Sequence, residues 1–176
     1  MQANNAVPTV KRRLICIVYE SLLLLAVEMF AIAVYLLVTF AAHSPVLDAG
    51  RGIFVILVAA AYFIYSWTGS GHTLAMKTWR IKIASAGAGR ISLRAAATRF
   101  ILAWGFVAPA LVIIHVSQLL TTRAGISMAV AILVGNIVLW SLTALLDKDR
   151  QFLHDRMAGT RLLQLPKPEK KAAKAA

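Results

Sequence analysis

Four long apolar runs divide the chain, and only short polar segments interrupt most of them. They cover residues 14–42, 46–67, 101–120 and 126–146, and the first holds just two charged side chains, Glu20 and Glu28. An α-helix needs about 20 apolar residues to cross a hydrocarbon core of roughly 30 Å. Backbone groups inside a bilayer must be paired within the segment itself, and these runs are too long for barrel strands. The pattern predicts an all-α membrane protein with four transmembrane helices.

The last two runs are separated only by residues 121–125, which predicts an antiparallel helical hairpin. The third run contains Pro109. Its ring removes a backbone donor and is expected to kink that helix.

One polar insertion, residues 68–99, lies between the second and third runs. Trp79, Ile81 and Ile83 alternate there with polar residues, and a Gly-containing turn at residues 87–89 leads to a second short apolar stretch at residues 91–93. Period-two alternation followed by a turn predicts a small β-hairpin on the cytoplasmic side, between helices 2 and 3. Ser92 is expected to be the N-cap of the third helix.

Composition supports the membrane assignment. The 176 residues are 60% hydrophobic and 15% charged, against roughly 45–50% and 25% in soluble domains. The net charge is +12, but 17 of the 19 lysines and arginines fall on one side of the predicted topology and only Arg51 and Arg123 on the other. The positive-inside rule therefore predicts a multi-pass protein of the bacterial inner membrane with both termini cytoplasmic. We expect anionic lipid headgroups, not nucleic acid, to be the electrostatic partner.

Glu20 and Glu28 require partners, because a carboxylate inside the hydrocarbon costs at least about 2.5–3.5 kcal/mol. Arg13 lies nearly two helical turns before Glu20, so the two share a helix face. His115 reaches about the depth of Glu28 at 1.5 Å per residue, which makes a Glu28–His115 pair one interpretation. The alternatives are that His115 reaches the outer interface or bonds a carbonyl freed by Pro109. Asn136 is either a further polar partner or a helix-helix contact.

A segment of mixed charge follows the fourth run and includes Asp147, Asp155 and Arg156. Its interleaved signs and apolar residues indicate that it folds back on the cytoplasmic helix ends, as a structural clamp or as a ligand site. We expect Arg13, Glu20 and Asp155 to converge there as one charge network, with Arg99 or Arg156 contributing.

Three stretches together resemble the RDD family of small bacterial membrane proteins, over about residues 11–163. They are the basic and acidic start of the first run, the Gly71-His72-Thr73-Leu74 segment leading through Trp79 to Arg99, and the closing His154-Asp155-Arg156 with Gly159-Thr160. The resemblance implies that the arginine and two aspartates that name the family correspond to Arg13, Glu20, and Asp155 or Asp147. Glu20 departs from the family's usual aspartate, and Ala75-Met76 stands where a Gly-Lys pair is common. The family is suspected of transport and has a member described as a sodium/proton antiporter.

Two functions fit these features. The first is proton-coupled transport of a monovalent cation or small solute by intramembrane carboxylates, which with so few spans requires a homo-oligomer. The second is a membrane accessory or assembly protein that binds a partner or anionic lipid. No HExxH, GxSxG or P-loop motif occurs in the sequence, so we expect no enzyme. We expect no cofactor and no metal site. The expected organisation is a cytoplasmic N-terminus at 1–13, a membrane domain at 14–163 and a disordered basic tail at 164–176.

Overall fold

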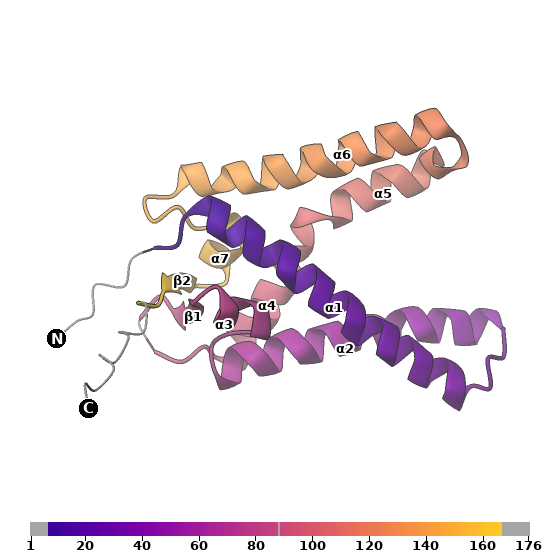
Figure 1. Cartoon of the computed structure of the whole chain (residues 1–176), viewed down its shortest axis with the longest axis horizontal. Helices are drawn as coiled ribbons and strands as arrows, with labels where there is room; N and C mark the ends of the chain where they lie inside the picture. Colours follow the sequence, from indigo (N-terminus) through magenta and orange to yellow (C-terminus); the bar gives the residue numbers. More distant parts are fainter. Residues whose placement is uncertain (1–6, 88, 167–176) are drawn as a thin grey trace, which may run out of the picture.

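Long helices dominate the computed structural model, which describes residues 7–87 and 89–166 (Figure 1). Helices α1 (Val10–Val38) and α2 (Pro45–Gly69) form one antiparallel pair, and α5 (Ala108–Val116) and α6 (Arg123–Leu142) form another. Figure 1 shows the two pairs diverging from a common end, where the smaller elements gather. We call this the basic end, because α1 begins there with Lys11, Arg12 and Arg13.

The third apolar run is a broken helix. It consists of α4 (Leu93–Ala103), the 3-10 turn η1 (Trp104–Phe106) and α5, and the axis bends by 46° at the break. Pro109 lies at the start of α5 and cannot donate to the carbonyl of Gly105, as a continuous helix would require. The side-chain amide of Asn136 on α6 donates to the carbonyl oxygens of Gly105 and Phe106, at 3.0 and 2.6 Å. Asn136 therefore satisfies backbone acceptors that the break exposes.

Three helices of the described residues are long and apolar enough to cross a membrane, and the broken helix makes a fourth if its two halves count as one span. The third of these helices is α6 continued by the 3-10 turn η3 (Thr143–Leu146). A second 3-10 turn, η2 (Leu119–Thr121), connects α5 to α6. The predicted helical membrane class thus agrees with the structure at the level of three to four candidate spans.

The strand predicted after the second helix exists, but its partner differs from the prediction. β1 (Ile81–Ser85) pairs antiparallel with β2 (Thr160–Gln164), with Ile83 opposite Leu162. Residues 91–93 form no strand: Ser92 caps α4 by accepting from the backbone N–H of Ala95, as predicted. The local hairpin is therefore replaced by a two-stranded sheet that joins the centre of the chain to its C-terminal part. Ala88, in the predicted turn, lies outside the described residues.

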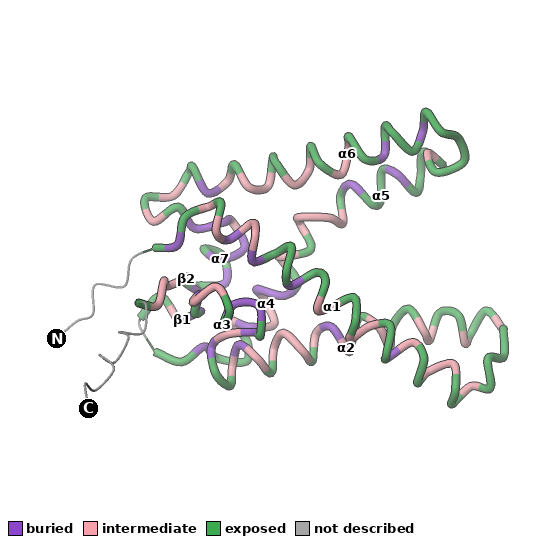
Figure 2. Tube along the Cα trace, viewed as in Figure 1, coloured by how far each residue is buried: buried purple, intermediate pink, exposed green. Residues whose placement is uncertain are grey.

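Two short helices complete the basic end: α3 (Leu74–Thr78) precedes β1, and α7 (Leu153–Met157) precedes β2. Buried residues concentrate here, whereas the diverging helix pairs are largely exposed along their length (Figure 2). Ile81, Ile83, Leu162, Trp67 and Phe100 belong to one buried apolar cluster. The predicted disordered tail falls mostly outside the described residues; of it, Gln164 is the last residue of β2.

Candidate functional site

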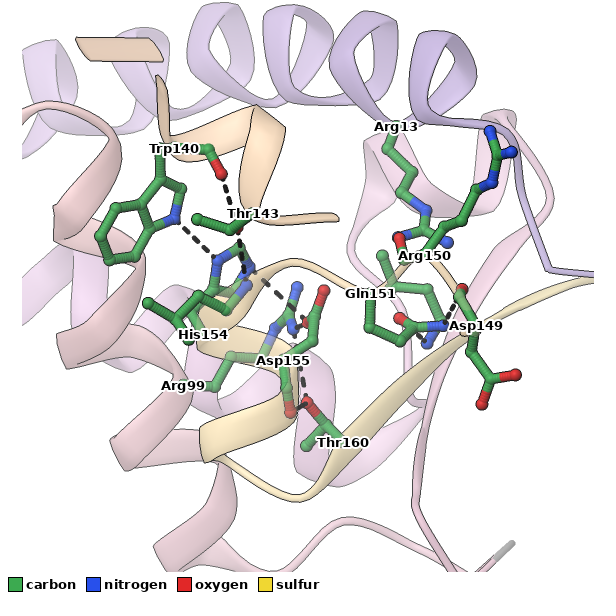
Figure 3. Close-up of polar contacts among 12 residues, drawn as sticks. Arg13, Arg99, Trp140, Thr143, Asp149, Arg150, Gln151, His154, Asp155 and Thr160 are labelled. Carbon is green, nitrogen blue, oxygen red and sulfur yellow. Dashed lines mark hydrogen bonds and ion pairs between the residues drawn. The ribbon is translucent and has the colours of Figure 1, made fainter. Parts of the chain in front are cut away.

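Arg99 and Asp155 form a buried ion pair at the centre of the basic end (Figure 3). Arg99 comes from α4 and Asp155 from α7, and the Asp155 side chain is completely shielded from solvent. The Arg99 guanidinium also lies 4.9 Å from the ring centre of Trp67, within the range of a cation–π contact. Thr160 accepts from Arg99 at 3.4 Å and donates to the Asp155 carbonyl oxygen at 3.2 Å. These contacts fasten α7 and the start of β2 to α4.

His154 lies beside this pair and bridges to α6. The indole N–H of Trp140 donates to its Nδ1 at 3.2 Å, and its Nε2 is 3.6 Å from an Asp155 oxygen. Burial first, and then the positive charges of Arg99 and Arg13, hold the pKa of His154 well below its usual value. The imidazole is therefore neutral at physiological pH, and its contact with Asp155 is not a charged ion pair.

Arg13 reaches the same region from α1. It donates through Nε to the Pro8 carbonyl at 3.0 Å and through Nη1 to the Arg150 carbonyl at 2.5 Å, and its guanidinium lies 5.5 Å from the Phe152 ring centre. Only 2% of Arg13 is exposed. Within the described part of the chain, Nη2 of Arg13 and Nε of Arg99 are buried without a hydrogen-bond partner. The charge of Arg99 is balanced by Asp155, whereas Arg13 has no ion pair among those residues.

Glu20 is buried two turns further along α1, and hydroxyl groups contact both of its oxygens. Tyr62 of α2 donates to one oxygen at 2.7 Å, and Thr73, at the start of α3, donates to the other. No ion pair to Glu20 occurs among the described residues. Arg13 and Glu20 share a helix face but form no hydrogen bond with each other. Arg13 donates to the carbonyls of Pro8 and Arg150, whereas Glu20 accepts from Tyr62 and Thr73.

A cavity of about 280 Å³ connects these side chains. Arg13, Glu20, Arg99 and His154 all contribute to its wall, together with apolar side chains from α1, α2, α4 and η1. Asp155 does not line it. The structure therefore places Arg13, Glu20 and Arg99 around one space, with Asp155 behind Arg99, rather than linking them in one continuous chain of ion pairs.

The remaining predicted site residues lie apart from this cavity. Nε of Arg156 is 3.5 Å from a carboxylate oxygen of Asp147 in a partly exposed pair, and Asp147 also accepts from the Gln151 backbone N–H at 3.0 Å. Within the part of the chain that the structure describes, no hydrogen bond or ion pair joins Glu28 to His115. Glu28 is half-buried and His115 is exposed. The described residues therefore show no direct Glu28–His115 contact of the kind that the matched residue counts suggested.

The predicted candidates did not include several polar residues of the site: Tyr62, Thr73, Gln151, His154 and Thr160. Gln151 is 3% exposed and accepts from the Leu162 backbone N–H at 3.2 Å, which ties the loop before α7 to β2. Thr73 and His154 lie in two of the three stretches that resemble the RDD family, so their positions carried a signal. Tyr62 lies inside an apolar run and carried none. In the described residues, no group of three or more His, Cys, Asp or Glu side chains could hold a metal ion.

Comparison with known proteins identifies one family. The model described as the RDD family matches residues 7–159, which is most of the chain. No curated protein and no solved structure matches significantly. The matched region includes Arg13, Glu20, Arg99 and Asp155.

Proposed function

The chain belongs to the RDD family, and from this premise we propose that it exchanges protons for a monovalent cation or small solute across the bacterial cytoplasmic membrane, with Glu20 as the exchanging carboxylate. One observation carries the proposal. Glu20 is a buried carboxylate on the wall of a cavity, and its hydrogen-bond partners are the hydroxyls of Tyr62 and Thr73 rather than a basic side chain. A charge buried in this way needs a counterion. A proton or a monovalent cation entering the cavity can supply it.

The hydroxyls of Tyr62 and Thr73 can contact Glu20 both when it carries a proton and when it binds a cation. With Glu20 ionised, each hydroxyl donates to the carboxylate, as the structure has them. Because a hydroxyl can also accept a hydrogen bond, either oxygen can rotate to accept from a protonated carboxyl or to contact a cation. Oxygen ligands of this kind suit hard cations. The site can therefore alternate between occupants without leaving a buried polar group unpaired.

We propose four spans with both termini in the cytoplasm. The described chain starts at Val7 and finishes at Pro166, both at the basic end, while Arg51 and Arg123 lie at the starts of α2 and α6, near the opposite end (Figure 1). This distribution supports cytoplasmic placement of the basic end. Four helices provide few walls for a transport pathway, so we further propose a homo-oligomer. We also infer that the protein is not an enzyme.

The test is proton flux in proteoliposomes. Purified protein is reconstituted with a pH gradient, and the gradient is followed by a pH-sensitive dye after addition of Na⁺ or K⁺. Glu20→Gln should abolish cation-dependent flux while purified yield stays near that of the unaltered chain. Glu28→Gln is the matched control: it removes a carboxylate from the same helix but away from the cavity, and flux should persist. Equal flux in all three proteins would overturn the proposal.

The second candidate is an accessory or assembly protein, and the Arg99–Asp155 pair favours it. That pair, with Thr160 and Gln151, serves to hold α7 and β2 against the basic end. Buried ion pairs can fix one arrangement of elements rather than act on a solute. Under this function, Glu20→Gln should lower the amount of folded protein or its association with a partner. Neither the unaltered chain nor Glu20→Gln should carry flux.

A further inference from the structure

The cavity has one polar end and one apolar side. Arg13, Arg99 and His154 lie at the basic end of the molecule, whereas Leu24, Ala103 and Val107 contribute apolar wall further along the helices. From Arg13 to Leu24, the cavity follows α1 for about 16 Å at 1.5 Å per residue. Its volume of about 280 Å³ lies near the lower end of the range for small-molecule pockets, roughly 300–1,000 Å³. The cavity therefore has charged side chains at one end and apolar side chains along the rest, which suits an amphiphilic ligand.

Two buried donor atoms at the polar end have no hydrogen-bond partner among the described residues. They are Nη2 of Arg13 and Nε of Arg99, in residues that are only 2% and 7% exposed. Burying a charged donor without an acceptor is costly. Both arginines line the cavity, so an anionic oxygen placed at this end would lie beside their positive charges. Arg99 is already paired with Asp155, whereas no ion pair to Arg13 occurs among the described residues, so Arg13 is the charge that lacks an anionic partner.

We infer that this cavity binds an anionic phospholipid of the cytoplasmic leaflet, with the phosphate at Arg13 and Arg99 and one acyl chain along α1 towards Leu24. Charge complementarity and the apolar wall select this occupant together. A free phosphate would leave the wall beside Leu24, Ala103 and Val107 unfilled, and a lipid without a phosphate, such as diacylglycerol, would leave Arg13 without an anionic partner.

Glu20 is the one acid in the cavity wall, and its position is compatible with such a lipid. Its oxygens accept from Tyr62 and Thr73, so their hydrogen-bonding capacity is directed at those hydroxyls. Asp155 contacts Arg99 without lining the cavity. The wall thus carries two positive groups and one negative group. The inference goes beyond the proposed transport function, since it rests on the two arginines and the apolar wall.

Tryptophan fluorescence gives a direct assay, because Trp104 lines the cavity. Protein in a neutral detergent is titrated with phosphatidylglycerol brominated on its acyl chains, and bromine quenches indole emission on contact. Brominated diacylglycerol with the same chains is the headgroup control, because it lacks the phosphate. We expect the phosphatidylglycerol to bind about tenfold more tightly, the factor expected for one charge-assisted hydrogen bond. Trp104→Phe should reduce the quenching, and Trp67, which also lines the cavity, should account for the signal that remains. Equal binding of the two lipids would overturn the inference.

Ala103→Phe tests the position of the chain without removing a charge. The added ring should occupy the apolar side of the cavity and weaken binding at least about tenfold, by displacing an acyl contact. Ala131→Phe is the matched control, because Ala131 is an exposed residue of α6 that does not line the cavity. Unchanged binding in Ala103→Phe would refute the site. The lipid assignment would also fail if inorganic phosphate displaced the brominated lipid as effectively as unbrominated phosphatidylglycerol does at the same concentration. The headgroup comparison uses the unaltered chain and decides the question even if a variant fails to fold.

The assay separates this inference from the transport proposal. Glu20→Gln removes the negative group of the wall but leaves both arginines, so it should retain or strengthen lipid binding while abolishing flux. Loss of lipid selectivity with normal Glu20-dependent flux would refute the lipid site alone. Normal lipid selectivity without any flux would refute the transport function alone.

Discussion

Asn136→Leu should destabilise the protein, because Asn136 supplies the hydrogen bonds that the broken helix lacks. Leucine has a similar size but cannot donate to the carbonyl oxygens of Gly105 and Phe106, which accept from the amide at 3.0 and 2.6 Å. Pro109 offers no N–H to replace it. Hydrogen bonds between membrane helices are each worth about 0.6 kcal/mol on average and up to about 1.7 kcal/mol. Losing two of them should lower the free energy of unfolding by about 1–3 kcal/mol.

The measurement is equilibrium unfolding in mixed micelles, with a denaturing detergent titrated against a neutral one and helix content followed by circular dichroism. Gly135→Ala is the neighbouring control. A Cβ at Gly135 meets nothing within 4 Å, and alanine favours a helix over glycine by about 0.8–1 kcal/mol, so this variant should be as stable as the unaltered chain or more so. If Asn136→Leu unfolds at the same detergent fraction as the unaltered chain, the amide does not support the break and the reasoning fails.

Three further predictions concern the basic end. Asp155→Asn should lower the free energy of unfolding by about 3–5 kcal/mol, because it leaves the buried Arg99 charge without its counterion; the same detergent titration measures the loss. Gly105→Ala should cost about 1–3 kcal/mol, since a Cβ at that position would collide with the Trp140 ring; unfolding of Gly105→Ala and Gly135→Ala should therefore shift in opposite directions. The free energy of unfolding should fall as the pH drops below about 6.5. The pKa of His154 is lowered in the folded state, so the unfolded chain binds the proton first. His154→Gln should reduce the dependence of the unfolding free energy on pH.

Each of these predictions has an internal comparison. Asp149→Asn breaks a partly exposed pair with Arg161, whose atoms lie 3.3 Å apart, so it should cost no more than about 1 kcal/mol. Similar losses for Asp155→Asn and Asp149→Asn would contradict the buried role of the Arg99 pair. A pH dependence identical in the unaltered chain and His154→Gln would show that other groups dominate the acid response.

Elements governed by local sequence were predictable. The length of each apolar run locates the long helices to within a few residues, and the hydroxyl of Ser92 caps α4 because a short side chain can accept from a backbone N–H of the first turn. The break before α5 follows from Pro109. These features depend on a few neighbouring residues, so a sequence pattern carries the information.

Contacts between distant segments were not predictable in the same way. The alternation around Ile81 and Ile83 indicates a strand but not its partner, and the partner strand at residues 160–164 comes from the far end of the chain. Counting residues gave Glu28 and His115 similar depths, yet depth fixes neither the helix face nor the neighbouring helix. For Glu20 the carboxylate itself was identified, but its hydroxyl partners belong to α2 and the start of α3 and become visible only in the fold.

The central claim is that Glu20 holds either a proton or a cation. Proton release on cation binding tests it most directly: purified protein in weakly buffered neutral detergent is mixed with NaCl or KCl, and the released protons are measured with a pH indicator against choline chloride as the ionic-strength control. The account predicts release from the unaltered chain and from Glu28→Gln, and none from Glu20→Gln. Equal release from the unaltered chain and Glu20→Gln, or no release from the unaltered chain with either cation, would contradict it.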